Sequence, residues 1–123
     1  MKIKQLSVFV ENKTGRINEV TQILGSNGVN MTAFSLADSG EFGILRMIVS
    51  DVGRAVSALK EARFGISVTE VVCFCCPNEP GALSIVLDCL ARENVFIEYM
   101  YAFSDGDTAR VVIRPTDLDR CIE

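Results

Sequence analysis

The feature that most constrains this chain is an internal repeat. Residues 9–31, FVENKTGRINEVTQILGSNGVNM, read as a strand end, a polar loop, an amphipathic helix and a glycine stop. Residues 75–97, CCPNEPGALSIVLDCLARENVFI, have the same order at an offset of 66 residues, the separation of Gly15 from Gly81. Other pairs at this offset are Asn12 with Asn78, Ile17 with Leu83, Leu24 with Leu90 and Val29 with Val95. The repeat predicts two similar structural units in one chain.

The first copy contains signals for six elements. Apolar alternation over residues 3–10 predicts a strand with one face on the core, formed by Leu6, Val8 and Val10. A helix is expected to begin near Gly15, with Asn12 or Thr14 as its cap, and to stop at Gly28. Strands are expected over 29–36, 42–49 and 66–72, with a turn at 38–41 and a helix from Asp51 to about 64–65. This order is the ferredoxin-like βαββαβ arrangement.

The second copy repeats the first up to its third strand. A strand ends at Cys76, a helix begins near Gly81, and strands over 94–103 and 109–114 follow, joined by a turn that is two residues shorter and that aligns Arg110 with Arg46. Residues 117–122 match 51–56, but nothing corresponds to 58–70. We therefore predict an α+β chain of two ferredoxin-like domains, 1–69 and 70–123, with antiparallel sheets and helices on one face. The second domain is C-terminally incomplete, and is either truncated or completed by another strand, for example from a partner.

Composition excludes several classes of function. The 123 residues carry a net charge of -4 and include no histidine, which argues against nucleic-acid binding and removes the commonest general base and metal ligand. The apolar runs are too short to span a membrane, and the first residues lack an export signal. Five cysteines without an export signal indicate a reducing compartment. We expect a cytoplasmic chain with no cofactor, no metal, and no membrane or nucleic-acid partner.

The cysteines at 73, 75 and 76 raise the question of a metal or redox site. Alternation along a strand points Cys73 and Cys75 to one side and Cys76 to the other, so the three thiols would not converge. We interpret them as small residues of a strand interior, and Cys89 and Cys121 as core residues of helices. For Arg46 and Arg110, ion pairs on the sheet are favoured over contact with a ligand carboxylate.

The two loop–helix junctions, NKTGRI at 12–17 and NEPGAL at 78–83, resemble those of the ACT domain, as does the sequence GVNM at 28–31. The resemblance covers nearly the whole chain as two tandem units. It implies a regulatory module that binds a free amino acid at an interface between such domains, and hence a homodimer. Carried over by position, the site comprises Asn12, Lys13, Thr14, Gly15, Arg16, Ile17, Asn30 and Met31. A weaker second candidate comprises Asn78, Glu79, Pro80, Gly81, Ala82 and Leu83, because Phe96 replaces Asn30 there.

The first junction also suits an amino acid on physical grounds. Unpaired N–H groups of Gly15 and Arg16 at a helix start would bind the α-carboxylate. Side-chain oxygens of Asn12 and Asn30, or backbone oxygens of the loop, would accept from the α-ammonium. Apolar atoms of Ile17 and Met31 would select the ligand side chain, and the lack of a counter-charge favours a neutral one.

We therefore expect a non-catalytic amino-acid sensor that acts through an unidentified protein target or through its own oligomer. An enzyme is disfavoured because the chain has no P-loop, no Gly-x-Gly-x-x-Gly loop and no paired carboxylates. The main alternative is an assembly module that needs no ligand. A ferredoxin-like RNA binder would need basic charge and exposed aromatic residues on its middle strands.

Overall fold

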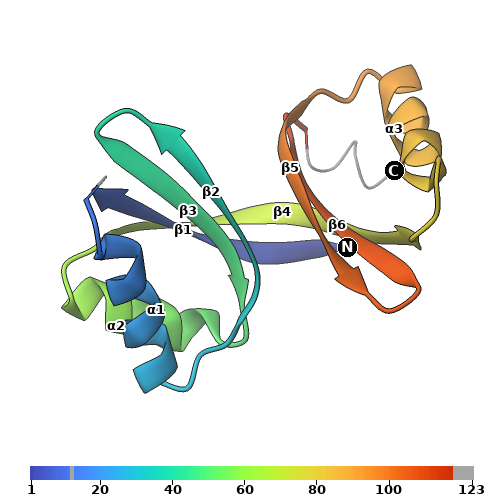
Figure 1. Ribbon diagram of the computed structural model, residues 1–123. Helices are drawn as coiled ribbons and strands as arrows, with labels where there is room; N and C mark the ends of the chain where they lie inside the picture. The colour runs from blue at the N-terminus through green and yellow to red at the C-terminus, as the bar shows by residue number, and fades with distance from the viewer. Residues whose placement is uncertain (12, 118–123) are drawn as a thin grey trace. The chain divides into compact units, whose positions relative to one another are not determined.

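The computed structural model describes residues 1–11 and 13–117, and its elements are labelled in Figure 1. In order they are β1 (Lys2–Glu11), α1 (Arg16–Ser26), β2 (Met31–Ser39), β3 (Phe42–Val49), α2 (Val52–Glu61), β4 (Gly65–Pro77), α3 (Ala82–Arg92), β5 (Ile97–Asp105) and β6 (Thr108–Pro115). The chain divides into a first unit, Lys4–Thr69, and a second unit, Met1–Ile3 with the residues from Glu70 onward. The long strands β1 and β4 therefore contribute residues to both units.

The first unit has the predicted βαββαβ order. Its strands lie in the order β2, β3, β1, β4, and β3 pairs antiparallel with both β1 and β2. Helices α1 and α2 cover one face of this sheet (Figure 1) and share a single core with it. The core includes Leu6, Val8, Val10, Leu45 and Met47 from the strands and Val20, Leu24, Ala55 and Leu59 from the helices. The predicted ferredoxin-like fold, with helices on one face, is confirmed.

Strand β1 is buried more widely than its alternation predicts. Gln5 and Ser7, on the face opposite Leu6 and Val8, are also buried. The Gln5 side-chain amide donates to the Thr69 hydroxyl over 3.4 Å, and a hydrogen-bonded amide is tolerated inside a protein. The predicted core face of β1, formed by Leu6, Val8 and Val10, is confirmed, and the opposite face is buried in addition at Gln5 and Ser7.

The beginning of the chain supplies a strand of the second unit. Its strands lie in the order β5, β6, β4, with Met1–Ile3 on the other side of β4. The Cys73 N–H donates to the Met1 carbonyl over 2.9 Å, and the Met1 ammonium donates to the Cys73 carbonyl over 3.3 Å. Met1–Ile3 thus lie beside β4 in the second unit as β4 lies beside β1 in the first unit. The additional strand expected from the sequence thus comes from the chain itself. The helix start predicted at 117–122 falls largely on 118–123, which lie outside the described residues.

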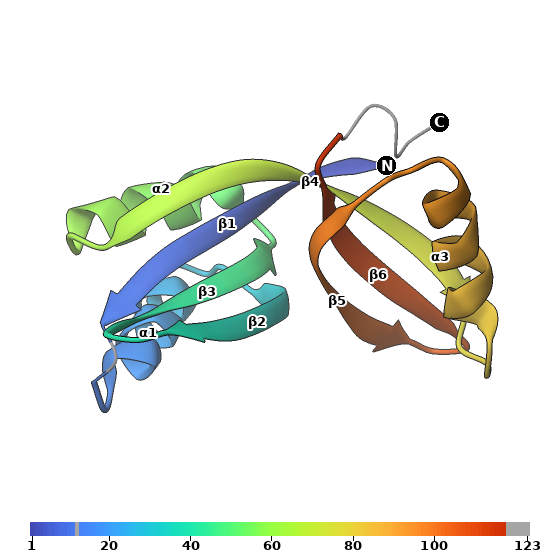
Figure 2. The same cartoon turned by 90° about the horizontal axis from the view of Figure 1, so that it is seen from above.

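Helix α3 covers one face of the sheet in the second unit (Figure 2). Its side chains Ala82, Leu83 and Leu90 pack against a core of Val72, Cys76, Val111 and Ile113. None of the α3 residues is fully buried, whereas α1 buries Val20 and Leu24 where it packs beside α2. The two helices that the repeat relates are thus covered to different extents.

Both hairpins turn through loops of two residues. Ser39 pairs with Phe42 and Asp105 pairs with Thr108, around Gly40 and Gly106 with positive φ. The offset of 66 therefore continues through the second hairpin, and the predicted shorter turn is wrong.

The same register corrects the predicted equivalence of the two arginines. Arg46 on β3 lies opposite Ser7 on β1. At the offset of 66, Ser7 corresponds to Cys73, and the residue opposite Cys73 is Val112 rather than Arg110. The match of Arg46 with Arg110 is therefore wrong. A shift of two residues leaves every side chain on its original face, so alternation could not reveal the error.

Each helix ends in a Schellman turn with one residue in the left-handed region. After α1, Gly28 has φ 70° and donates to Gly25, and the Val29 N–H donates to Leu24 over 2.9 Å. The predicted stop at Gly28 is confirmed. The same position is taken by Arg63 with φ 68° after α2 and by Asn94 with φ 57° after α3.

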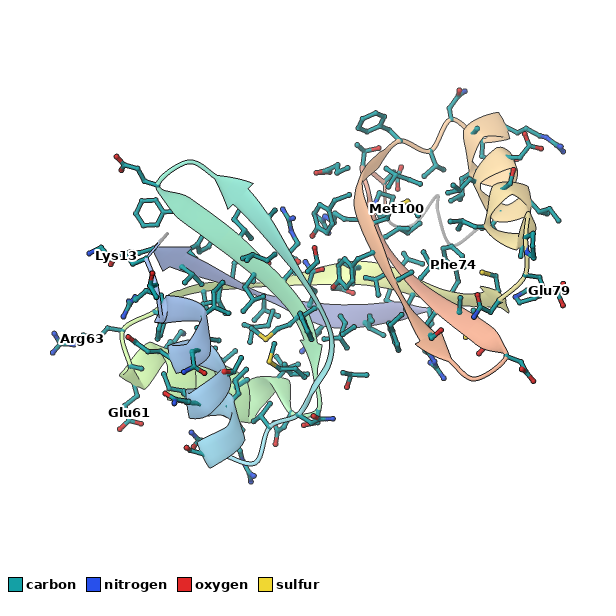
Figure 3. The ribbon with its side chains drawn as sticks, viewed as in Figure 1. Lys13, Glu61, Arg63, Phe74, Glu79 and Met100 are labelled. Atoms are coloured by element: carbon teal, nitrogen blue, oxygen red, sulfur yellow. The ribbon has the colours of Figure 1, made fainter. Side chains whose placement is uncertain are left out.

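Arg63→Gly should stabilise the protein. An arginine held at positive φ is strained, and its side chain points away from the helices (Figure 3). Relief of this strain outweighs the extra unfolded-state entropy of glycine, and we expect a gain of about 0.5–1 kcal/mol in the free energy of unfolding, measured in urea. Asn94→Gly is the matched control and should gain less, since asparagine tolerates this conformation. A loss of stability in Arg63→Gly would mean that the arginine side chain contributes more than the strain costs.

Candidate functional site

The loop between β1 and α1 turns on Gly15, which is the N-cap of α1 with φ 90°. Among the described residues no side chain caps the helix, so the predicted cap at Thr14 is wrong, and Asn12 lies outside the described residues. The Arg16 guanidinium is 2.7 Å from Glu19 and lies over the Phe64 ring, 4.9 Å from its centroid. Its charge is therefore engaged within the first unit.

The backbone N–H groups open to an anion differ from those expected. The Arg16 N–H already donates to the Lys13 carbonyl over 3.3 Å. In a helix that begins at Arg16, the N–H groups of Ile17 and Asn18 have no intrahelical acceptor. A carboxylate at this loop would therefore meet Ile17 and Asn18 rather than Arg16.

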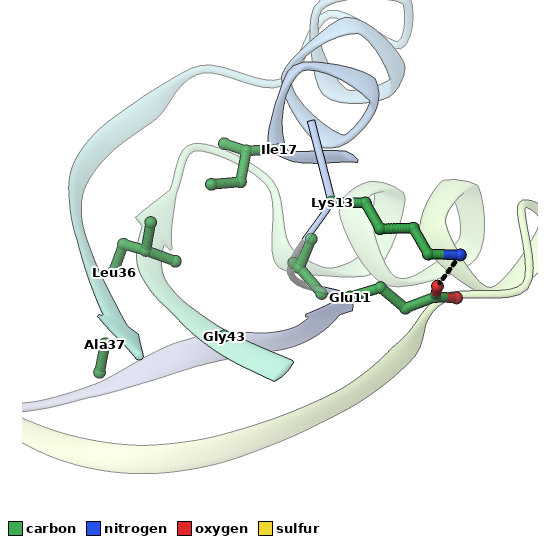
Figure 4. Close-up of a pocket in the computed structure, with 7 residues that line it drawn as sticks. Glu11, Lys13, Ile17, Leu36, Ala37 and Gly43 are labelled. Carbon is green, nitrogen blue, oxygen red and sulfur yellow. Dashed lines mark ion pairs between the residues drawn. The ribbon is translucent and has the colours of Figure 1, made fainter. Parts of the chain in front are cut away.

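A pocket of about 220 Å³ lies beside this loop (Figure 4). We call it the loop pocket. It is lined by the end of β1, the loop, the first turn of α1, the middle of β2 and the start of β3. Its residues are Val10, Glu11, Lys13, Ile17, Leu36, Ala37 and Gly43. The interior is thus mainly aliphatic, and one acidic and one basic residue line its loop side.

Glu11 and Lys13 form an ion pair, with the Lys13 Nζ 3.0 Å from Glu11 Oε2. Their charged ends meet on the side of the loop away from Leu36 and Ala37 (Figure 4). Both residues also line an adjoining hollow of about 470 Å³ with Gly40, Glu41 and Phe42. The ion pair is therefore accessible from the aliphatic pocket and from a more acidic surface.

Lys13→Met should raise the pKa of Glu11. The hydrogen bond from Lys13, and then its charge, hold the pKa of this carboxyl below the ordinary value of 4.5. Because the pKa is lowered in the folded state, the pair stabilises the protein above about pH 4.5, and this contribution is lost as the pH falls through the lowered pKa. The effect on stability is small because the pair is exposed. NMR titration of the Glu11 carboxyl carbon measures the change, and Lys60→Met on α2 should leave it unaltered.

Asn30 and Met31 do not lie at the loop pocket. They stand at the start of β2, where the Asn30 N–H donates to the Ser50 hydroxyl over 2.8 Å and Met31 packs against the core. Leu36 and Ala37, which do line the pocket, are five to seven residues farther along the chain. At about 3.3 Å per residue, this separation is of order 15–20 Å. Within one unit, the structure brings Lys13 and Ile17 together but separates them from Asn30 and Met31.

The second predicted loop has a similar backbone but different neighbours. Gly81 is the N-cap of α3 with φ 85°, and the Ala82 N–H donates to Glu79 as Arg16 does to Lys13. Glu79, Pro80, Gly81 and Ala82 line a hollow of about 390 Å³ together with Cys75, Cys76, Pro77, Ile85 and Val86. Asn78 instead donates from its N–H to the Asp107 carbonyl, and Leu83 packs into the core.

The lining residues that sequence analysis missed are Val10, Glu11, Leu36, Ala37 and Gly43. The strand topology indicates that these residues lie near the loop. Because β3 runs antiparallel to β1, its first residues lie beside the end of β1, and the hairpin therefore returns to the loop. The same argument places the start of β2 at the opposite end of the sheet.

The cysteines are distributed over buried and exposed positions. Cys73 and Cys76 are buried, whereas Cys75 and Cys89 are exposed, so the predicted core positions of Cys75 and Cys89 are wrong; Cys121 lies outside the described residues. Burial raises the pKa of Cys73, partly offset by the charge of Arg110. Within residues 1–11 and 13–117, no three potential metal ligands gather in one place.

Comparison with known proteins decides the family. The model of the ACT domain pair matches residues 1–123. The chain belongs to the ACT domain pair family. None of the curated proteins compared with this ACT domain pair matches it. No helix in the part of the chain that the structure describes is long and apolar enough to cross a membrane.

Solved structures agree with the family. This ACT domain pair is 52% identical to protein BT0572 from Bacteroides thetaiotaomicron, with a TM-score of 0.95 over 99% of this chain and 85% of that chain. The ligand-free regulatory subunit of aspartate kinase from Thermus thermophilus is 14% identical, with a TM-score of 0.70 over 97% and 87% of the two chains. The corresponding subunit from Thermus flavus is 12% identical, with a TM-score of 0.68 over 99% and 91%. The ACT domain pair thus shares its fold with regulatory subunits.

Proposed function

We propose that this ACT domain pair is a non-catalytic sensor that binds a free amino acid at the loop pocket. The observation that carries the proposal is the Glu11–Lys13 ion pair beside an aliphatic pocket. An α-amino acid presents an ammonium, a carboxylate and a side chain from one carbon atom. Glu11 complements the ammonium, Lys13 complements the carboxylate, and the pocket takes the side chain.

Opening the ion pair for a ligand costs little. The Glu11 and Lys13 side chains are 45% and 72% exposed, and exposed ion pairs contribute little to stability. A zwitterion replaces both partners at once, so neither charge is left without a counter-charge. The ion pair can therefore open for a zwitterionic ligand, and the pair itself has no net charge.

The absence of histidine from the sequence supports a regulatory rather than a catalytic role. The output of the sensor passes to a protein target or to its own oligomer. We place the protein in the cytoplasm, in keeping with the free thiols of Cys73, Cys75, Cys76 and Cys89. Shared fold with a regulatory subunit of aspartate kinase supports the same role.

Thermal unfolding of the purified chain with each of the twenty amino acids at millimolar concentration tests the proposal. A ligand at 100 times its Kd adds about 2.7 kcal/mol, which shifts the midpoint by several degrees. Leu36→Glu should abolish the shift because it places a carboxylate in the pocket. Val68→Glu, an exposed apolar strand position away from the pocket, is the control and should retain it. No shift with any amino acid would favour the ligand-free assembly module.

We also propose that the protein forms a homodimer through β2. This strand stands at the end of the strand order, and its side chains Phe34 and Leu36 are 63% and 53% exposed. Apolar edge strands tend to pair with another chain, and a second copy pairs symmetrically. The loop pocket borders the same strand, so a dimer brings a second copy close to the ligand.

Phe34→Glu should convert the dimer to a monomer. A carboxylate at this exposed edge position opposes pairing of two identical strands, without disturbing the core. Sedimentation velocity of the wild type and the variant measures the change, with Val68→Glu as the control. A wild type that sediments as a monomer at high micromolar concentration would rule out this interface.

A further inference from the structure

Gly43 forms part of the wall of the loop pocket, next to Leu36. It pairs with Val10 on β1 and Asp38 on β2. A Cβ atom at Gly43 would lie 3.3 Å from Leu36 Cδ1 and 3.5 Å from the Ala37 carbonyl oxygen. Leu36 is more than half exposed, so its flexible end can move in response. The size of residue 43 therefore controls how much room Leu36 leaves for a ligand.

Apart from Glu11 and Lys13, the rest of the lining is aliphatic. The aliphatic side chains of this lining are those of Val10, Ile17, Leu36 and Ala37. The charged ends of Glu11 and Lys13 meet each other on the side away from Leu36 and Ala37 (Figure 4). A charged ligand side chain in this pocket would lose its hydration without gaining a partner. An aliphatic side chain loses nothing and buries its surface.

The second unit does not repeat this wall. At the offset of 66, Gly43 corresponds to Ala109, and the same strand pairing joins Ala109 to Cys76 as joins Gly43 to Val10. Leu36 and Ala37 correspond to Ala102 and Phe103, and Glu11 and Lys13 correspond to Pro77 and Glu79. The combination of an ion pair, a glycine and a leucine is therefore specific to the first unit.

We propose that the loop pocket selects amino acids with branched aliphatic side chains, valine, leucine and isoleucine, and that Gly43 and Leu36 together set the size limit. This inference rests on the proposed function of the pocket. Each methylene that enters the pocket strengthens binding about four-fold. Valine, with two more carbon atoms than alanine, should therefore bind about 15-fold more tightly than alanine.

Isothermal titration calorimetry of the full chain with glycine, alanine, valine, leucine, phenylalanine and lysine tests the selection. In the wild type, valine and leucine should bind most tightly and lysine should bind more weakly than alanine. Gly43→Ala should weaken valine and leucine about 10-fold and leave alanine within two-fold, because the added Cβ atom crowds the end of the Leu36 side chain and so reduces the room for longer ligand side chains. Leu36→Ala should shift the preference towards phenylalanine because it widens the pocket.

Ala109→Gly, at the equivalent position of the second unit, is the matched control and should leave every affinity unchanged. Circular dichroism checks that Gly43→Ala is folded. If no amino acid binds the wild type, the proposed function itself fails. If an amino acid binds but the order of affinities does not follow side-chain size, only the size-selection inference is overturned. The same holds if Gly43→Ala weakens the binding of all ligands equally.

Discussion

Lys13→Glu should lower the affinity for the bound amino acid by about 30-fold or more. The ligand carboxylate would then face carboxylates at positions 11, 13 and 41, all of which line the two adjoining hollows. The fold should be retained, since the Lys13 side chain is largely exposed and its ion pair contributes little to stability. Calorimetric titration with the amino acid that stabilises the wild type measures the loss.

Glu79→Lys is the matched control for this charge reversal. Glu79 occupies the equivalent position of the second unit, in a loop with the same backbone turn. It should leave the affinity within two-fold of the wild type. Equal losses in Lys13→Glu and Glu79→Lys would mean that overall charge, and not the Glu11–Lys13 pair, governs binding.

Leu24→Ala should destabilise the protein by about 3 kcal/mol, within the range for truncation of a buried leucine. Leu24 is only 1% exposed and lies in the core that α1 shares with α2 and the sheet. Its truncation leaves a cavity that the surrounding strands cannot fill. Urea unfolding, followed by circular dichroism, measures the change in the free energy of unfolding.

Leu90→Ala at the equivalent position of α3 provides the comparison. Leu90 packs against the core of the second unit but is only partly buried. We expect a cost of about 1–2 kcal/mol, because less apolar surface is lost and no closed cavity forms. Equal costs for the two variants would show that α3 is covered in solution as completely as α1.

Much of the fold could be predicted because the repeat presents the same local signals in two copies. The stripe of Val20 and Leu24, the cap at Asp51 and the stop at Gly28 each have a local cause, and the structure has all three. Asp51 accepts from the Arg54 N–H over 3.1 Å, as expected of a helix cap. Local signals of this kind depend on neighbouring residues, so a single sequence contains them.

The position of the site was harder to predict because it depends on strand direction. The family resemblance groups Asn30 with the loop, yet β2 begins at the end of the sheet far from Lys13. Leu36 and Gly43 reach the loop only because the β2–β3 hairpin turns back beside Glu11. Neither residue belongs to a recognisable motif, and leucine and glycine occur in strands for many reasons unrelated to ligand binding.

The strand formed by the first residues could not be predicted either. Nothing in the sequence of Met1–Ile3 distinguishes the end of a long strand from a pairing segment of another unit. The burial of Cys73 and the exposure of Cys75, two residues apart on one strand, likewise depend on distant parts of the chain. Such features follow from tertiary packing, which outweighs local pattern.

During synthesis, residues 1–3 leave the ribosome before Cys73, which exchanges two hydrogen bonds with Met1 and lies 72 positions later. The first unit is continuous from Lys4 to Thr69 and can close while the remainder is still being made. Met1–Ile3 must wait for β4 to extend before it finds its partner. The two units therefore acquire their structure in a set order, the continuous unit before the discontinuous one.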